Sequence, residues 1–137
     1  MPKNLEQRLI RAAIEASRNA VAPYSGFAVG AALLTDTGEI FTGANIESAS
    51  FGLTCCAERV ALFKALSEGR RKFTAIAVVA PMPGGAMPCG ACRQLLAEYA
   101  PRATLWVADS ARPERVRKFS VASLLPGAFT TFNQSNK

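Results

Sequence analysis

The sequence predicts an α/β fold in which a mixed β-sheet has helices on both faces. Three observations lead to this fold class, the first being that helical and strand-like segments alternate along the chain. A short turn joins the first two strand-like segments, which is typical of an antiparallel hairpin. Two later segments are almost wholly apolar, as strands buried on both faces are. The length of 137 residues predicts a single domain over residues 1–137, with the last residues, about 131–137, mobile.

The N-terminal part of the chain predicts a helix followed by a β-hairpin. Apolar side chains recur with helical spacing within residues 4–20, at Leu5, Leu9, Ala12, Ala13 and Ala16. The segment APYSG ends this helix, because proline and glycine disfavour its continuation. The segments FAVGAALLT (27–35) and EIFTGANI (39–46) have the composition of strands, and the turn DTG between them supplies a glycine where a positive φ is needed.

Two further helices and a buried strand are expected in the middle of the chain. The first helix covers residues 54–68, and Gly69 suits its C-terminal cap. The apolar segment FTAIAVVA (73–80) predicts a strand that is buried on both faces. The second helix covers residues 89–100 and is stopped by Pro101.

The C-terminal part supplies the remaining strands. The segment ATLWVAD (103–109) predicts another buried strand, and RKFSVA (117–122) predicts a last one. The segment SLLPGAF (123–129) is expected to form a short closing turn or helix. Together with the hairpin, these strands make a mixed sheet with at least one antiparallel pair.

The composition limits the classes to which the protein can belong. No apolar run reaches the roughly 18 residues that span a bilayer, so no membrane partner is expected. The charged N-terminal segment lacks the apolar stretch of a signal peptide, which predicts a cytoplasmic protein. In that reducing compartment the four cysteines are expected to be thiols or metal ligands. The net charge of +6 is spread along the chain without interleaved aromatic residues, so no nucleic-acid partner is expected.

The spacing of three cysteines predicts a metal site. Cys89 and Cys92 stand three residues apart at the start of a predicted helix, where both sulfurs lie on one face. Cys56 stands near the start of another predicted helix. The chain contains no histidine, so a site for a soft metal must consist mostly of thiolates. Three thiolates leave a fourth tetrahedral position open, which distinguishes catalytic zinc sites from structural ones.

Two charged residues beside Cys56 extend this site. Glu58 lies two residues further along and can reach a water molecule on the metal, where a general acid or base is needed. Zinc with three thiolates carries a net negative charge, and two helix N-termini draw part of it off the sulfurs. For the same reason we expect Arg59 to donate a hydrogen bond to a ligand sulfur.

The motif CAE followed by PCGAC matches the signature of the zinc deaminases, with cysteine in place of histidine. Four segments, in order, resemble those of cytidine deaminases of the short, homotetrameric type: APYSGFAVGAALL, GANIESASFGLTCCAERVALFKALSEG, PCGACRQLLAEY and LLPGAF. The resemblance implies a three-layer α/β/α sandwich with a mixed five-stranded sheet. It also implies a homotetrameric enzyme of pyrimidine salvage that hydrolytically deaminates cytidine and deoxycytidine to uridine and deoxyuridine, with release of ammonia.

The resemblance further implies roles for individual residues. It makes Cys56, Cys89 and Cys92 the ligands of one Zn²⁺ per subunit. In the implied reaction a hydroxide on the zinc attacks C4 of the base while Glu58 shuttles protons. The implied substrate contacts are Phe27 against the pyrimidine ring, Asn45 and Glu47 at the ribose hydroxyls, Ala57, and Phe129 from a neighbouring subunit. For Phe27 and Phe129 the alternative is ordinary core packing, and for Asn45 it is a place in a turn.

Three other functions remain open from the sequence. One is a related deaminase, of blasticidin S or of the free base, although the N-x-E pair favours a nucleoside. Another is a structural zinc module that binds RNA, in which Cys55 or another group closes the site and Glu58 has no role. The third is a thiol oxidoreductase that uses Cys89 and Cys92. In the deaminase interpretation Cys55 is a small buried hydrophobe that points away from Cys56 round the helix.

Overall fold

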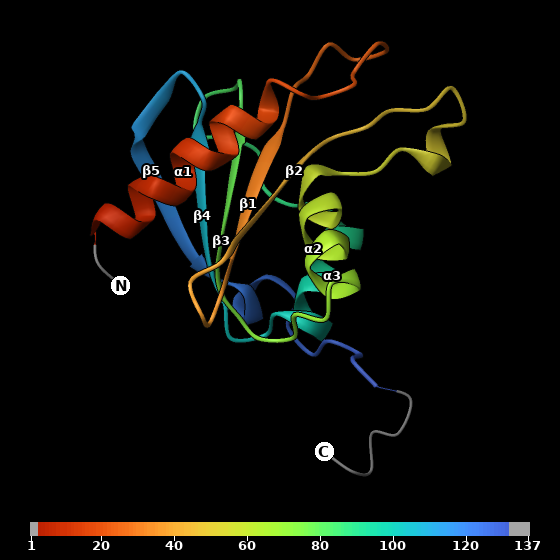
Figure 1. The fold of residues 1–137 in the computed structure, drawn as a ribbon. Coiled ribbons are helices and arrows are strands. Elements are labelled where there is room, and N and C mark those ends of the chain that lie inside the picture. The colour runs from red at the N-terminus through yellow and green to blue at the C-terminus, as the bar shows by residue number, and fades with distance from the viewer. Residues whose placement is uncertain (1–2, 132–137) are drawn as a thin grey trace.

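A computed structural model describes residues 3–131, which are built around a mixed five-stranded sheet (Figure 1). The strands are β1 (Gly30–Thr35), β2 (Ile40–Ala44), β3 (Phe73–Ala80), β4 (Thr104–Asp109) and β5 (Arg112–Ser120). They lie in the order β2-β1-β3-β4-β5. The pair β3 and β4 is parallel and the other neighbours are antiparallel, which confirms the mixed sheet that the sequence predicts.

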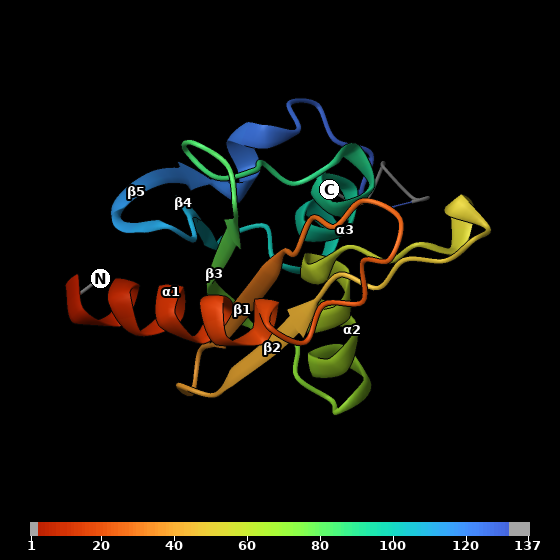
Figure 2. The ribbon, with the colours of Figure 1, turned by 90° about the horizontal axis from the view of Figure 1, so that it is seen from above.

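Three helices of the described chain cover the two faces of this sheet. They are α1 (Lys3–Ser17), α2 (Ala57–Ser67) and α3 (Gly90–Tyr99). Figure 2 shows α1 along one side of the sheet and α2 with α3 on the other. The fold is therefore the three-layer α/β/α sandwich that was expected.

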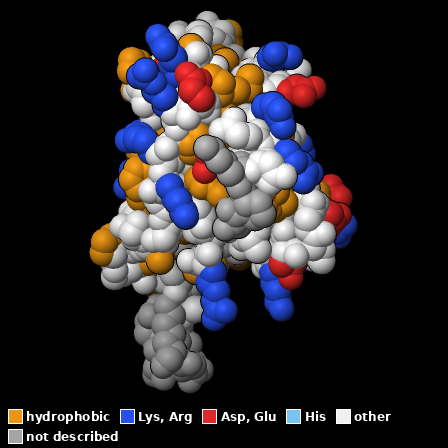
Figure 3. Space-filling model, turned by 90° about the vertical axis from the view of Figure 1, so that its left-hand side faces the viewer, with side chains coloured by type: hydrophobic (Ala, Val, Ile, Leu, Met, Phe, Trp, Pro, Cys, Tyr) orange, Lys and Arg blue, Asp and Glu red, His pale blue; other side chains and the backbone are white. Residues whose placement is uncertain are grey.

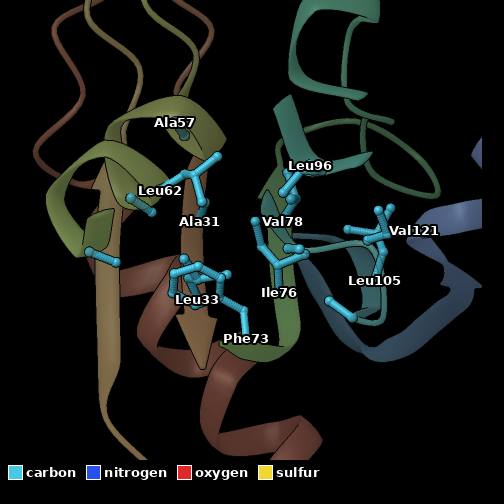
Figure 4. Close-up of a cluster of buried hydrophobic side chains, with 14 of the residues drawn as sticks. Ala31, Leu33, Ala57, Leu62, Phe73, Ile76, Val78, Leu96, Leu105 and Val121 are labelled. Carbon is cyan, nitrogen blue, oxygen red and sulfur yellow. The ribbon is translucent and has the colours of Figure 1, made fainter. Parts of the chain in front are cut away.

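Alternate residues of the strands belong to two separate hydrophobic cores, because successive strand side chains point to opposite faces of the sheet. On the side of α2 and α3, a cluster of fully buried side chains joins the helices to the sheet; it includes Leu33, Leu62, Ile76, Leu96 and Leu105 (Figure 4). On the side of α1, the corresponding cluster includes Leu9, Ile10, Leu34, Val79 and Trp106. Each fully buried aliphatic side chain stabilises the fold by about 1.5–3 kcal/mol. The first cluster holds α2 and α3 together against the sheet.

The helix predicted over residues 54–68 begins later than the sequence indicates. Residues Phe51–Leu53 form a 3₁₀ turn, and α2 starts only at Ala57. Between them Cys55 is extended, because its N–H and its carbonyl are both bonded to the backbone of Ile46. The periodic apolar pattern could not reveal this, since the pairing with Ile46 depends on a segment nine residues away.

The last strand is longer than RKFSVA and starts earlier, at Arg112. It pairs with β4 as a hairpin, in which Thr104 lies opposite Ser120 and Asp109 opposite Arg112. The segment carries many charges because β5 is an edge strand with its outer side exposed, and charged side chains are usual on edge strands. Its polar composition therefore hid its start from the sequence analysis.

The surface seen in Figure 3 carries scattered charges. Lys and Arg side chains are distributed over this face, with Asp and Glu side chains among them. Among residues 3–131 no helix is both long and apolar enough to cross a membrane. The mobility predicted for residues 131–137 concerns mostly 132–137, which lie outside the described residues.

Close packing between β2 and α2 depends on Gly43. A Cβ atom at this position would lie 2.5 Å from the carbonyl oxygen of Ala57 and 2.6 Å from the backbone nitrogen of Ala61. Because both contacts are to backbone, a side chain could be accommodated only if α2 moved away from the sheet.

Gly43→Ala should therefore destabilise the protein by about 1–3 kcal/mol, the usual cost of an overpacked core. Urea unfolding followed by circular dichroism measures this change. Gly52→Ala is the matched control, because a Cβ atom there would have nothing within 4 Å. Equal unfolding midpoints for the two variants would contradict the packing argument.

Candidate active site

Three cysteine sulfurs meet where α2 and α3 begin. Cys56 is the N-cap residue of α2, Cys89 is that of α3, and Cys92 lies in the first turn of α3. The sulfur of Cys89 is 3.6 Å from that of Cys56 and 3.5 Å from that of Cys92. All three sulfurs lie within 4.8 Å of one another. Sulfurs around tetrahedral zinc, with Zn–S bonds of about 2.3 Å, are about 3.8 Å apart, so this donor set fits zinc.

The helix caps leave these sulfurs available. Cys56 and Cys89 both have extended backbones, with φ of −69° and −68°, and neither side chain caps its own helix. Their sulfurs are thus free to face the shared centre. The two helix N-termini also bring the positive ends of their dipoles to this point, which favours thiolates.

The three thiols hold a negative charge among them even before a metal is considered. A hydrogen bond from Cys92, with further ones from Arg59 and Cys89, lowers the pKa of Cys56 to about 5, although burial opposes the shift. The same contact with Cys56, together with burial, raises the pKa of Cys92. Cys56 is therefore the sulfur on which the charge is centred, and a thiolate is the form that binds metal.

Arg59 lies against this charge. Its Nη2 atom is 3.7 Å from the sulfur of Cys56 and donates a hydrogen bond of 3.1 Å to the carbonyl of Thr54. The Nε atom is buried and has no hydrogen-bond partner among residues 3–131. The contact expected from the sequence is thus present, and its effect on a metal-loaded site stays a prediction.

Glu58 is a buried acid at the edge of the sulfur group. It is only 5% exposed, and burial raises the pKa of its carboxyl to about 7. A group with such a pKa both accepts and releases a proton near neutral pH, as general acid–base catalysis requires.

A small cavity of about 170 Å³ lies beside this acid and two of the sulfurs. Its walls are Val29, Asn45, Thr54, Cys56, Ala57, Glu58, Val78, Ala86, Met87 and Cys89. Half of these residues are apolar, and the others carry an amide, a hydroxyl, a carboxyl and two thiols. Such a mixed lining suits a small ring that carries polar atoms.

Asn45 and Glu47 both contact the segment that precedes β1. The Asn45 side chain accepts a hydrogen bond from the N–H of Val29 at 2.9 Å and donates one to the carbonyl of Phe27 at 2.8 Å. The Glu47 carboxylate accepts bonds from the N–H groups of Tyr24 and Ser25 at 2.9 and 3.1 Å, and from the Ser25 hydroxyl. These contacts lower the pKa of Glu47, the Ser25 hydroxyl most of all.

The two residues do not continue β2, which ends at Ala44. Asn45 lines the small cavity, whereas Glu47 lines an adjoining outer hollow with Tyr24, Ser25, Phe51 and Thr54. The chain nevertheless stays extended here, because Ile46 between them pairs with Val21 and Cys55, so Asn45 and Glu47 lie on the same side of this segment. Thr54 lines both hollows, so the two adjoin, and the ribose contacts of Asn45 and Glu47 stay predictions.

The other predicted contacts divide between the cavity and the surface. Ala57 is fully buried and lines the cavity. Phe27 is half-buried and its carbonyl is held by Asn45, but its side chain is not part of the cavity wall. Phe129 is 50% exposed and lies elsewhere, where its carbonyl accepts a bond of 2.7 Å from Gln94. Within one chain, Phe129 does not line the cavity.

Several residues of the site were not found from the sequence. Ser25, Thr54, Ala86 and Met87 line the two hollows but lie in loops without a periodic pattern. Only their place in the tertiary structure brings them to the site. The composition of the loops offered no signal for it.

Cys55 stays outside the sulfur group, as expected, but for a different reason. It is extended and paired with Ile46, so it is separated from Cys56 by the alternation of an extended chain rather than by rotation round a helix. Burial raises the pKa of its thiol, which disfavours the thiolate.

Comparison with known proteins shows which of them resemble this chain in sequence and in fold. The model for the "Cytidine and deoxycytidylate deaminase zinc-binding region" matches residues 3–108. The chain is 54% identical to a cytidine deaminase of Halalkalibacterium halodurans, over 90% of this chain and 93% of that protein. It is 46% identical to one of Sporosarcina psychrophila, over 90% of each. The crystal structure of a cytidine deaminase from Burkholderia pseudomallei superposes with a TM-score of 0.86 and 47% identity, over 94% of this chain and 100% of that one.

Zinc content tests which cysteines bind the metal. Cys55→Ala should retain as much zinc per chain as the unaltered protein, because Cys55 lies outside the sulfur group. Cys92→Ala, which removes the same atoms from inside the group, should lose most of it. Atomic emission on purified protein measures the stoichiometry, and loss of zinc from Cys55→Ala would reverse the assignment.

The buried carboxyl predicts a pH dependence of stability in zinc-free protein. Glu58 has a pKa of about 7 in the folded chain and 4.5 in the reference state, so the folded protein retains a proton that the unfolded chain releases. The stability that this proton contributes is therefore fully present below pH 4.5 and is lost as the pH rises towards 7. Relative to Glu58→Gln, the free energy of unfolding should fall by about 1.4 kcal/mol per pH unit across this window. Urea unfolding in the presence of a chelator measures the free energy of unfolding of both proteins against pH. Parallel pH profiles would contradict the prediction.

Proposed function

This chain belongs to the cytidine and deoxycytidylate deaminase family, and from that premise we propose that it hydrolytically deaminates cytidine and deoxycytidine to uridine and deoxyuridine, releasing ammonia. The observation that carries the proposal is the meeting of three sulfurs with zinc-like spacing and a buried acid on one cavity wall. A structural zinc module has no use for that acid, and a thiol oxidoreductase that uses Cys89 and Cys92 has none for Cys56.

The proposed metal ligands are Cys56, Cys89 and Cys92. When bound there, zinc lowers the pKa of a water molecule so that hydroxide is available at neutral pH. Two of the three sulfurs line the cavity, so the fourth coordination position is expected to face the substrate. Arg59 and the two helix N-termini offset the negative charge of three thiolates, which would otherwise weaken this effect.

Glu58 is the proposed proton carrier. Its pKa of about 7 lets it take a proton from water and give one to N3 of the cytosine ring. It then takes the proton of the hydroxyl group now bonded to C4 and delivers it to the departing amine, which leaves as ammonia while C4 becomes the carbonyl of the product. The carboxyl is buried and interacts with Cys56 and Cys92, so it lies beside the proposed metal ligands.

We propose that the base occupies the small cavity and the sugar the outer hollow. Ala57 forms part of the cavity wall, and Asn45 stands at the boundary with one amide hydrogen to spare. Glu47 lines the outer hollow and can accept a bond from a ribose hydroxyl with its remaining lone pairs. Phe27 is proposed to pack against the pyrimidine ring once substrate is bound.

The assembly and location are part of the same proposal. We propose that residues 1–137 form a single catalytic domain that acts as a homotetramer in the cytoplasm, in pyrimidine salvage. The exposed ring of Phe129 then enters the site of a neighbouring subunit. None of the four cysteines, which all lie within residues 3–131, forms a disulfide, and a reducing compartment favours this state.

Turnover tests the proposal directly. Mixing the zinc-loaded protein with cytidine should lower the absorbance of the cytidine band, and a strong chelator should abolish this change. Glu58→Gln should keep its zinc and lose nearly all turnover, because the amide cannot carry the proton. Full activity in that variant would refute the mechanism.

A panel of substrates separates the related functions. Cytidine and deoxycytidine should both react, whereas cytosine and adenosine should not. Turnover of cytosine alone would indicate an enzyme for the free base. Retention of zinc without any turnover would instead favour a structural zinc module.

A further inference from the structure

The loop between β3 and α3, residues 81–88, connects the cavity wall to the sulfur group. It supplies Ala86 and Met87 to the wall and leads directly into Cys89. The path of this loop therefore determines how wide the cavity is beside two of the sulfurs. The contacts that hold the loop in place should therefore affect how substrate binds in the cavity.

The loop is pressed against the end of β4 by two consecutive glycines. Gly84 and Gly85 both have φ of +75°, which side chains other than glycine rarely adopt. A Cβ atom on Gly85 would lie 2.6 Å from the carbonyl oxygen of Ala108 and 2.8 Å from the Cγ1 atom of Val107. The chain approaches β4 so closely that only glycine fits.

Arg117 of β5 holds this part of the loop. Its Nε atom donates a hydrogen bond of 2.9 Å to the carbonyl oxygen of Gly84. Its guanidinium lies 5.7 Å from the centre of the Phe119 ring, which packs against the core on the side of α2 and α3. The arginine is thus supported from its own strand while it bonds the loop.

The far end of the loop is held by another arginine. The Nε atom of Arg93 in α3 donates a hydrogen bond of 2.8 Å to the carbonyl oxygen of Pro88, which is fully buried. Ala86 and Met87 therefore lie between two anchored carbonyls, those of Gly84 and Pro88. Of the two arginines, only Arg117 lies outside the helix that carries two of the sulfurs.

We propose that Arg117 is a positioning residue for the deamination: by holding the Gly84 carbonyl it keeps Ala86 and Met87 at the distance at which the cavity fits the base. This inference rests on the proposed function. The cavity wall contacts the base both in the bound substrate and in the transition state. Displacing the wall therefore weakens the binding of both states alike, which raises KM more than it lowers kcat. Zinc retention should not change, because Arg93 still anchors the chain next to Cys89.

The experiment compares R117Q with K118Q. Lys118 is one residue along β5 and pairs with Trp106, whose side chain belongs to the core beneath α1, so it faces away from the loop. Its side chain makes no hydrogen bond or ion pair within residues 3–131. Both substitutions remove one positive charge from the same strand, and only R117Q removes the bond to Gly84.

R117Q should raise KM for cytidine about three- to tenfold, the effect of one lost hydrogen bond, with kcat within about twofold of the unaltered enzyme. R117K, which can still donate to the carbonyl, should recover part of the loss, and K118Q should match the unaltered enzyme. A KM for R117Q equal to that of K118Q overturns the proposal. So does a fall in kcat that accompanies loss of zinc, because Arg117 would then support the metal ligands.

Hydrogen exchange provides a readout that does not depend on activity. The amides of Met82 and of residues 84–87 should exchange faster in R117Q than in K118Q, while those of α2 stay equally protected. Equal exchange in the loop overturns the anchoring. If the unaltered protein turned over no pyrimidine nucleoside, the proposed function would fail, and this measurement would still decide whether Arg117 holds the loop.

Discussion

The structure depends on bringing two helix N-termini to one point. Cys56 and Cys89 begin α2 and α3, and their sulfurs lie 3.6 Å apart. Such an approach concentrates negative charge, so it requires positive charge close by. The helix dipoles and Arg59 supply part of it, and a divalent cation supplies the rest. The packing of both helices against the sheet, and of α2 against Gly43, maintains the approach.

The same packing also buries Glu58 and so changes the pKa of its carboxyl. Glu58 lies in the first turn of α2, and closing the helices over the sheet leaves it almost without solvent. Burial then raises the pKa of its carboxyl to about 7. Cavity size alone does not identify such a site, because a hollow of about 540 Å³ at the start of β3 and β4 is larger. Its charged lining consists of Asp36, Arg71, Lys72 and Arg102, and among the described residues no group of three possible metal ligands lies there.

The walls of the site are held by side chains that bond to the backbone of distant loops. Asn45 and Glu47 bind the segment before β1, and Arg93 and Arg117 bind the loop before α3. In each case a side chain with fixed hydrogen-bonding geometry satisfies backbone groups that no helix or strand satisfies. The residues expected at the ribose therefore also hold the segment that precedes β1.

The sequence by itself determined the layered α/β fold, the order of its elements and the three cysteines with Glu58, because these depend on local periodicity and short spacings. Only the tertiary structure decided the pairing of Cys55 with Ile46, the length of β5, and which loop residues form the cavity wall. Those features arise from contacts between segments far apart in the chain. One example is the hydrogen bond between Arg117 and Gly84, which are 33 positions apart. It forms because β5 lies next to β4 in the sheet and the loop that carries Gly84 packs against the end of β4.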